Sequence, residues 1–592
     1  MVSQQSSDSV IYVARYIGYM AIYYQKKNGK TYAYRSTSHR VPGKKNPVST
    51  NEYLGTVDPE TGEIVPKKVR AAPAQSAGAD PGDGEMYALR YGSVVFLDAV
   101  QRSLHIEEDL NASFPDLSKK ILATAMAQVL EPSVMDEIHL TVEESVISGF
   151  LQIRGDLSPP VLSEMTKDIG MSMVSMESFF EERYARQKGD TFAIDITSES
   201  TYGNLGGWAE WGYNRDRERL KQVNWLLVTD SEGIPMGFQM LPGSVADITT
   251  LKTVVDSLKE RGLTGDALFD RGFESAGNVR YLLDNGIGFV TPSNIDSKAL
   301  KSVLTDCYPL VKDPRNQDIL DGNRYGHITV SIGIVPKNAK EDCTEFVYAT
   351  DKDRGWESAV RCSAHVIYNP DAEVRVTDSF MADLHAMKTR LEGLKYCEAA
   401  KELQKRKDLS GAITLIPGEG GKTVAEINWN SVSFSNNRAG IYILMTPEGT
   451  PWDTAVSAYE LRNQVEEAYD AYKNDLDGKR IRTPDPDRAR GRFFVRFVAL
   501  MMIIYIRRAL RMYSDSLPKS KRKDDKVHRM TVREVIRSLN SVMAVGSLGN
   551  WKLTHISKTN RQIFAAFGIA DICTGRIMER KDYVCKLPEK AS

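Results

Sequence analysis

The spacing of apolar residues changes along this chain and divides it into regions. In residues 93–186, apolar residues recur at helical spacing between proline-containing breaks, which predicts a bundle of several helices. Before residue 70, runs rich in β-branched and aromatic residues predict a small basic β-module with a hairpin turn at 26–30. Residues 71–85 are rich in Ala, Pro and Gly, show no apolar period and predict a linker. The first three predicted units are therefore 1–70, 71–85 and 86–190. The helical unit fits either a DNA-binding region or a plain connector.

A different order of elements begins after residue 190. Three apolar strands are followed by helix, strand, helix and strand, at residues 191–197, 224–229, 236–241, 247–260, 266–270, 275–284 and 288–291. This is the element order of a ribonuclease-H-like α/β fold with a mixed sheet. Residues 296–440 interrupt it with strands and a helix of their own, and a passage of this length predicts an inserted, β-rich subdomain rather than a loop. The predicted α/β domain thus has two parts, 191–295 and 441–513.

The end of the chain is basic and has a helical pattern. Its longest apolar run, 497–506, is shorter than the ~20 residues that cross a bilayer, so it predicts a buried helix and no membrane partner. Thr531 and Glu534 have the spacing of a helix capping box. We assign residues 514–592 to a basic, helical C-terminal region, and we expect its loop at 519–523 to contact phosphate.

Composition and charge narrow the class of protein. With 592 residues, 42% of them hydrophobic and 26% charged, the chain is too long for one small module and too apolar for a disordered one. Its six cysteines form no C-x-x-C pair and no secretory segment is seen, which favours a reducing, cytoplasmic location. Residues 479–529 hold 16 Lys and Arg against 5 Asp and Glu, although the net charge of the chain is −1. Basic ends around an acidic middle suggest a protein that binds a polyanion, but uneven surface charge without a ligand gives the same pattern.

Two aspartates stand out on predicted strands. Asp195 lies within one apolar strand and Asp270 at the carboxyl end of another, where burying a carboxylate is costly without a partner or a cation. The carboxyl ends of neighbouring strands are the usual ligand site of an α/β sheet, so we expect the two side chains to meet there. A divalent cation would keep both ionised against their mutual repulsion. Two separately satisfied strand aspartates are the alternative.

A third carboxylate lies on a predicted helix near the end of the α/β domain. At 100° per residue, Tyr459, Arg462, Glu466 and Lys473 project within an arc of roughly 60°. An apolar stripe beside this face would pack the helix on the sheet. Taken alone, the pattern also fits an Arg462–Glu466 ion pair on a surface helix.

Together these residues resemble the insertion-sequence transposases that have a DDE catalytic triad and a Tyr-Arg-Glu-Lys signature. Asp195, Asp270 and Glu466 match the triad, and the spacing Tyr459-x2-Arg462-x3-Glu466-x6-Lys473 matches the signature. The β-rich insertion between the second Asp and the Glu is also similar to this family. The resemblance covers about residues 190–500 and includes further stretches at 212–216, 220–224, 242–247, 269–273 and 439–446, while 53–65 resembles the openings of some members.

The resemblance implies a DNA transposase, an enzyme that cleaves the ends of a mobile element and transfers them into target DNA. It makes Asp195, Asp270 and Glu466 the catalytic residues that hold two Mg²⁺ ions, for which Mn²⁺ can substitute. Tyr459, Arg462 and Lys473 would bind DNA phosphates near the cut. The implied partners are terminal inverted repeats and target DNA, bound by a homodimer. The implied location is the cytoplasm, in association with the nucleoid.

Other functions fit the sequence less well. A stand-alone ribonuclease-H-like nuclease or resolvase would not require the insertion or the basic tail. A relative that has lost catalysis and acts as a DNA-binding regulator is the alternative, and it predicts a missing carboxylate, whereas all three are present. A glycosidase would place an aromatic sugar platform, rather than Arg and Lys, beside its carboxylates. Trp356 and Trp429 in the insertion are both candidates for stacking a flipped base, and the role is assigned to neither.

Overall fold

The β-rich start of the chain folds as a unit of its own, Met1–Asp83, separate from Gly84–Ser592. The structure, a computed structural model, describes residues 15–17, 20–27, 30–39, 48–59, 64–66, 86–187, 191–212, 218–245, 247–338, 344–518, 520–547, 549–569, 577 and 579–587. The first unit is one antiparallel sheet whose strands follow chain order: β1 (Arg15–Ile17), β2 (Met20–Lys27), β3 (Lys30–His39), β4 (Val48–Val57) and β5 (Ile64–Pro66). Lys27 pairs with Lys30, which agrees with the predicted hairpin. The predicted linker 71–85 lies outside the described residues.

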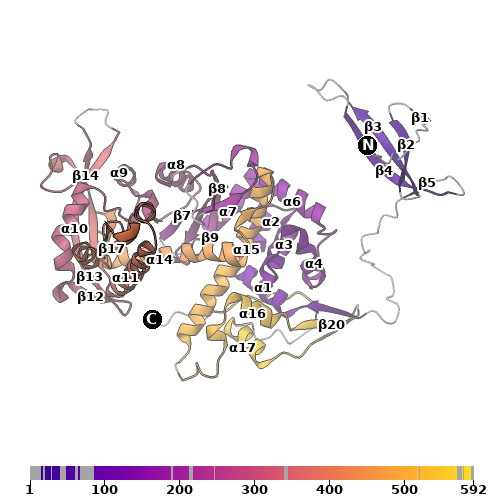
Figure 1. The fold of residues 1–592 in the computed structure, drawn as a ribbon. Coiled ribbons are helices and arrows are strands. Elements are labelled where there is room, and N and C mark those ends of the chain that lie inside the picture. The colour runs from indigo at the N-terminus through magenta and orange to yellow at the C-terminus, as the bar shows by residue number, and fades with distance from the viewer. Residues whose placement is uncertain are drawn as a thin grey trace, which may run out of the picture. The chain divides into compact units, whose positions relative to one another are not determined.

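The predicted helical region follows the short strand β6 (Tyr87–Arg90). Its helices are α1 (Gly92–Ser103), α2 (Ile106–Ser113), α3 (Ser118–Leu130), α4 (Ile138–Glu143), α5 (Ile147–Phe150), α6 (Pro159–Met171) and α7 (Met173–Ala185). α1, α3 and α6 contact the long helix α15 (Pro486–Ser516), which runs beside them in Figure 1. A Cβ built on Gly170 of α6 would lie 1.7 Å from the carbonyl oxygen of Asp487, and one on Gly491 of α15 would lie 1.7 Å from that of Thr166. Only glycine permits two helices to approach this closely.

The central sheet has the predicted ribonuclease-H-like order. Its strands are β7 (Thr191–Thr201), β8 (Lys221–Asp230), β9 (Pro235–Pro242), β10 (Asp266–Phe269) and β11 (Phe289–Pro292). β7, β8 and β9 form an antiparallel meander, and β10 and β11 follow on the other side of β7 in parallel orientation. The intervening helices are α8 (Asp247–Glu260) and α9 (Ala276–Asp284). The prediction of three strands followed by helix, strand, helix and strand is thus confirmed.

The predicted insertion divides into two halves. The first half holds α10 (Lys298–Val311), β12 (Gln317–Leu320), β13 (Asn323–Pro336), β14 (Phe346–Ala349) and β15 (Val360–Tyr368), and these strands extend the central sheet through β18 (Ile441–Pro447). The second half has a small core of its own around Leu384, Leu391 and Ala425. It contains α11 (Pro370–Glu392), α12 (Tyr396–Gln404), β16 (Ile413–Pro417), β17 (Thr423–Ile427) and α13 (Trp429–Asn437).

The sequence pattern of residues 423–434 predicts one strand of the insertion, and this prediction is wrong in its second part. The strand β17 ends at Ile427 and the helix α13 begins at Trp429. The side chain of Asn428 accepts a hydrogen bond from the backbone N–H of Ser431 at 3.2 Å, which caps the new helix. This cap, rather than the apolar side chains of Trp429, Val432 and Phe434, decides the local structure.

The chain then returns to the sheet and ends in helices. β18 pairs with β11 and is followed by α14 (Trp452–Asp470), a π-helical turn (Ala471–Asp475) and β19 (Arg480–Ile481), which pairs with β7. The apolar run 497–506 is buried inside α15, as predicted. At the start of that helix, the ring of Phe493 stacks on Trp225 of β8 with ring centroids 3.8 Å apart. Among the described residues, no helix is both long and apolar enough to cross a membrane.

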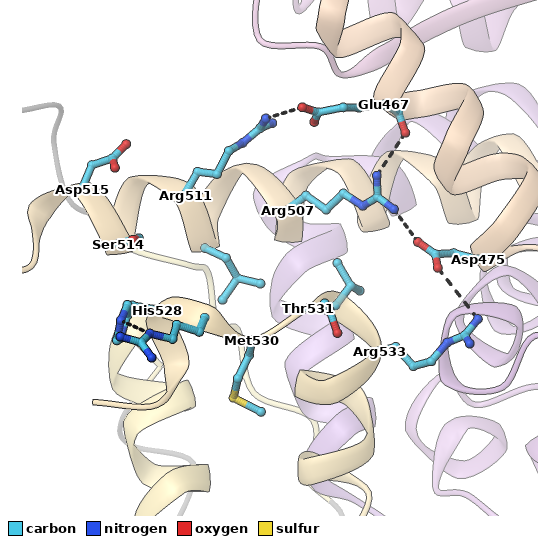
Figure 2. Close-up of a pocket in the computed structure, with 13 residues that line it drawn as sticks. Glu467, Asp475, Arg507, Arg511, Ser514, Asp515, His528, Met530, Thr531 and Arg533 are labelled. Carbon is cyan, nitrogen blue, oxygen red and sulfur yellow. Dashed lines mark hydrogen bonds and ion pairs between the residues drawn. The ribbon is translucent and has the colours of Figure 1, made fainter. Parts of the chain in front are cut away.

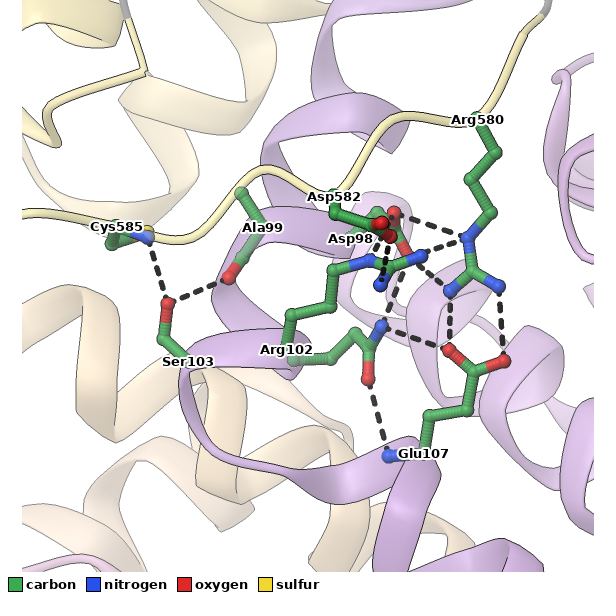
Figure 3. A network of polar contacts seen from close by, with 9 residues as sticks. Asp98, Ala99, Arg102, Ser103, Glu107, Arg580, Asp582 and Cys585 are labelled. Atoms are coloured by element: carbon green, nitrogen blue, oxygen red, sulfur yellow. Dashed lines mark hydrogen bonds and ion pairs between the residues drawn. The ribbon is translucent and has the colours of Figure 1, made fainter.

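The C-terminal region closes back onto the first helices. It contains α16 (Val532–Leu539), β20 (Met543–Ser547), β21 (Asn550–Leu553) and α17 (Lys558–Ala566), and β20 pairs with β6. Thr531 and Glu534 form the predicted capping box. Figure 3 shows Arg580 bound to Asp98 of α1 and Glu107 of α2, with the Arg580 Nη1 to Glu107 Oε1 distance at 2.9 Å. These ion pairs fix the end of the chain on the helical region.

Candidate active site

Strand register sets the two predicted aspartates side by side. β10 runs parallel to β7, and its last residue, Phe269, lies opposite Ile194. One step further along the two strands are Asp270 and Asp195. Asp195 is buried, whereas Asp270 is partly exposed. Each carboxylate accepts a hydrogen bond from the backbone N–H of the next residue, at 2.7 Å for Asp195 and 2.6 Å for Asp270.

Helix α14 carries Glu466 and packs against β7 and β10. The hydroxyl of Tyr469, three residues after Glu466, donates to the backbone carbonyl of Asp195 at 2.6 Å. The hydroxyl of Tyr472 donates to the carboxylate of Glu199, also on β7, at 2.9 Å. Residues three apart lie on the same side of a helix, so the bond from Tyr469 places Glu466 beside the strand of Asp195.

The guanidinium of Arg462 joins the carboxylates of two elements. Its Nη2 lies 3.1 Å from Asp270 Oδ1 and 2.5 Å from Glu466 Oε1. Burial alone would lower the pKa of Arg462, but the negative charges of Asp270, Glu466 and Asp195, together with the Tyr459 hydroxyl, outweigh it and raise the pKa. Arg462 therefore bridges Asp270 and Glu466, and Asp195 is near enough for its charge to favour the protonated guanidinium.

A cavity of about 360 Å³ opens beside these groups. It is lined by Asp195, Thr197, Arg462, Glu466, Tyr469, Asp470, Lys473, Asn474 and Lys479. Tyr459 is absent from this lining and contacts Arg462 instead, because its hydroxyl accepts a hydrogen bond from Arg462 Nη1 at 3.3 Å. All six predicted site residues therefore line this cavity or contact Arg462.

Lys473 departs from the helical phase that the sequence predicts. The prediction places Tyr459 to Lys473 on one α-helix, but α14 ends at Asp470 and a π-helical turn follows. Hydrogen bonds from i to i+5 widen this turn, so residues after it are shifted relative to an α-helical wheel. The predicted arc is thus wrong for Lys473, although Lys473 still lines the cavity of Glu466. Single π-helical turns occur often at functional sites.

Sequence reasoning missed a buried polar group next to the site. Glu199 accepts hydrogen bonds from Trp225 Nε1 and the Tyr472 hydroxyl, both at 2.9 Å, and its other oxygen lies 3.5 Å from Arg496 Nη1 of α15. Burial raises the pKa of Glu199 despite the charge of Arg496. The signal in the sequence was the spacing of four from Asp195, which puts both carboxylates on the same face of a strand.

The two tryptophans of the insertion lie apart from the cavity lining. The guanidinium of Arg361 sits over the ring of Trp356, with its carbon 5.1 Å from the ring centroid. Trp429 begins α13 and is 58% exposed. The base-stacking role predicted for one of them stays a prediction.

The donor set suits a hard divalent cation, but the side chains are not arranged around one. In the part of the chain that the structure describes, no three His, Cys, Asp or Glu side chains are grouped so that they could hold a metal ion. The guanidinium of Arg462, which lies between Asp270 and Glu466, gives the physical reason. Carboxylate oxygens are the ligands that Mg²⁺ prefers, and the raised pKa of Arg462 marks this position as one that favours a cation.

Comparison with known proteins adds one match. A family model described as a transposase DDE domain matches residues 186–502, which contain Asp195, Asp270 and Glu466. Among curated proteins, no match was found.

Proposed function

The chain belongs to the transposases with a DDE domain, and from that premise we propose that it cleaves DNA at the ends of a mobile element and joins those ends to target DNA. Asp195, Asp270 and Glu466 are the proposed catalytic residues. One observation carries this assignment: Arg462 contacts Asp270 and Glu466 together, and the charge of Asp195 also raises its pKa. Two carboxylates far apart in the sequence thus share one guanidinium, and the third contributes to the negative charge around it.

The same carboxylates are the residues that would hold divalent metal. When bound, Mg²⁺ or Mn²⁺ would activate the attacking oxygen and stabilise the leaving oxygen of the phosphodiester. Asp195 lies on the buried strand β7, while the side chain of Glu466 on α14 is 52% exposed. Arg462 must release Asp270 and Glu466 for these carboxylates to act as ligands.

Basic side chains beside the carboxylates would bind the DNA. Arg462 offers a planar fork for a phosphate, and Lys473 and Lys479 line the same cavity. Tyr459 would act by orienting Arg462, to which its hydroxyl is hydrogen-bonded. The proposed partners are the terminal inverted repeats and the target DNA. Joining two ends in one assembly requires two active sites, for which we propose a homodimer.

A cleavage assay tests the proposal. Purified full-length protein is incubated with Mg²⁺ and an end-labelled duplex that carries the inverted repeat flanking the reading frame. We expect a new 3′-hydroxyl end, and a loss of rate of roughly 10³-fold or more in each of Asp195→Asn, Asp270→Asn and Glu466→Gln. These changes keep the size and one acceptor oxygen of each side chain.

Asp470→Asn is the matched control, because Asp470 lines the same cavity but is not a proposed ligand. We expect this variant to cleave at a rate close to that of the parent. The assignment is wrong if the three variants cut as fast as the parent while their melting temperatures are unchanged.

A further inference from the structure

A cluster of basic side chains lines a second cavity, far along the chain from the carboxylates. This cavity of about 710 Å³ lies between the loop after α15, the 3₁₀ turn Val527–Arg529, α16 and the start of α17. Its lining includes Arg522, Lys523, Lys526, Arg529 and Arg537, which we call the C-terminal basic groove. All five lie after residue 502, where the match to the transposase family model ends.

The acidic residues of the groove are already satisfied by local hydrogen bonds. Asp525 is buried and accepts hydrogen bonds from the backbone N–H of Val527 at 2.7 Å and from the Tyr513 hydroxyl at 2.5 Å. Glu534 accepts bonds from the backbone N–H of Thr531 at 2.8 Å and from its hydroxyl at 3.0 Å, as part of the capping box. Neither carboxylate is therefore engaged by the lysines and arginines beside it.

The basic residues of the groove are not neutralised by carboxylates. Within the described residues, Lys523, Lys526 and Arg537 make no ion pair, Arg529 donates to His528 Nε2 at 3.0 Å, and Arg522 donates to the carbonyls of Ser514 and Leu517 at 3.0 and 3.3 Å. Five positive charges thus face one concave surface. Such a surface attracts anions and concentrates them at its wall.

A neighbouring cavity extends from the groove to α14, the helix that carries Glu466. It has a volume of about 630 Å³ and shares Arg529 and Met530 with the groove. Figure 2 shows its other wall, where Arg507 lies between Glu467 and Asp475, and where Arg533 reaches toward Asp475. Arg533 also donates to the backbone carbonyl of Asn474 at 3.3 Å, and Asn474 lines the cavity of Asp195 and Glu466. The groove therefore borders a cavity that reaches α14, and the hydrogen bond from Arg533 to Asn474 links the wall of that cavity to the lining of the candidate active site.

We propose that the C-terminal basic groove binds the phosphate backbone of the duplex DNA that enters the candidate active site. The proposal rests on the proposed function for its choice of DNA as the polyanion. Point charges of lysine and arginine contact phosphates without reading bases, so the groove supplies affinity and orientation rather than sequence choice. The groove binds several consecutive phosphates, because its basic side chains come from three segments: the loop after α15, the 3₁₀ turn and α16.

Salt dependence of binding gives the test. Affinity of the full-length protein for a fluorescent duplex is measured by anisotropy over a range of salt concentrations, without divalent metal so that no cutting occurs. The groove variant is Lys523→Gln, Lys526→Gln and Arg537→Gln combined. We expect the affinity of this variant for the duplex to fall at least tenfold. We also expect the slope of log K against log salt concentration to become less steep, by roughly 0.9 for each phosphate contact removed.

The matched control removes three positive charges elsewhere, as Lys119→Gln, Lys301→Gln and Lys401→Gln combined. These lysines are exposed and lie on α3, α10 and α12. The control should keep the salt slope of the parent, and replacing Lys523 and Lys526 by Arg should keep it too, since charge is retained. Equal melting temperatures of parent and variants establish that folding is intact.

Failure of this proposal can be told apart from failure of the proposed function. A parent that binds the duplex in the metal-free assay but does not cut it in the cleavage assay with Mg²⁺, together with a groove variant that binds weakly, supports the groove and contradicts the nuclease. A groove variant that keeps both the affinity and the salt slope of the parent overturns the groove. Weakened binding of RNA or of an acidic peptide, with duplex DNA unaffected, overturns it as well.

Discussion

Arg462 is the residue that brings two carboxylates of the candidate active site together. Asp270 and Glu466 would repel each other if both were ionised without a cation between them. Arg462 supplies that cation, and its Nε is buried without a hydrogen-bond partner among the described residues. A buried donor without a partner calls for an explanation, and a phosphate oxygen of the bound DNA would provide one. The same side chain would then hold the carboxylates before DNA binds and the DNA afterwards.

A second buried carboxylate, away from the site, makes stability depend on pH. Asp230 ends β8, and its Oδ1 accepts hydrogen bonds from the backbone N–H groups of Glu232 and Ile234, both at 2.9 Å. Burial raises the pKa of Asp230 from 3.8 to about 6, because it outweighs these hydrogen bonds and the charge of Arg183. The folded state therefore holds this proton more tightly than the unfolded state. Ionisation of Asp230 therefore lowers the free energy of unfolding as the pH rises from about 4 to about 6. Above this range the contribution of Asp230 to stability no longer changes with pH.

The variant Asp230→Asn tests this pH dependence. Asparagine keeps the acceptor oxygen for both backbone N–H groups and cannot ionise. We expect it to be more stable than the parent at about pH 7.5, by on the order of 2 kcal/mol, and to differ little near pH 4. Melting temperatures of both proteins at the two pH values measure the effect. An equal difference at the two pH values would contradict the raised pKa.

At the scale of elements, the contact between α6 and α15 depends on two glycines. Replacing Gly491 by Ala would put a Cβ 1.7 Å from the carbonyl oxygen of Thr166, so the two helices must move apart. We expect a loss of on the order of 3 kcal/mol in the free energy of unfolding, seen as a lower midpoint in urea. Gly149→Ala in α5 is the control, because an added Cβ meets nothing within 4 Å there. If both variants unfold at the parent's midpoint, the helices do not pack as closely as described.

The order of helices and strands could be predicted from the sequence where burial gives the apolar residues a regular spacing. The strands β7 to β11 and the buried part of α15 follow from apolar runs, although β7 and β8 are longer than the predicted 191–197 and 224–229. The spacing of Asp195, Asp270 and Glu466 also pointed to one site. Features decided by single hydrogen bonds or by packing could not be read in this way. Examples are the cap at Asn428, the π-helical turn after Asp470, and the strands of the insertion that extend the central sheet.

At the scale of the whole molecule, the segment matched by the transposase model forms only part of the fold. Residues 186–502 contain the central sheet, the insertion and α14, but the core they build is completed by the helical region and by the C-terminal region. α15 starts inside the matched segment and ends beyond it, so it ties the carboxylate site to the C-terminal basic groove. DNA bound as proposed would pass from one of these places to the other beside Arg533 and Asn474.

Iron-directed cutting of the polypeptide measures most directly whether Asp195, Asp270 and Glu466 gather around one metal. Fe²⁺ added in place of Mg²⁺, with ascorbate and peroxide, produces hydroxyl radicals that cut the chain beside the bound ion. In the complex of the full-length protein with the end duplex, we predict cuts beside all three residues together, suppressed by excess Mg²⁺ and lost in Asp270→Asn. Cuts beside only one of them, or cuts that excess Mg²⁺ leaves unchanged, would contradict a shared metal site.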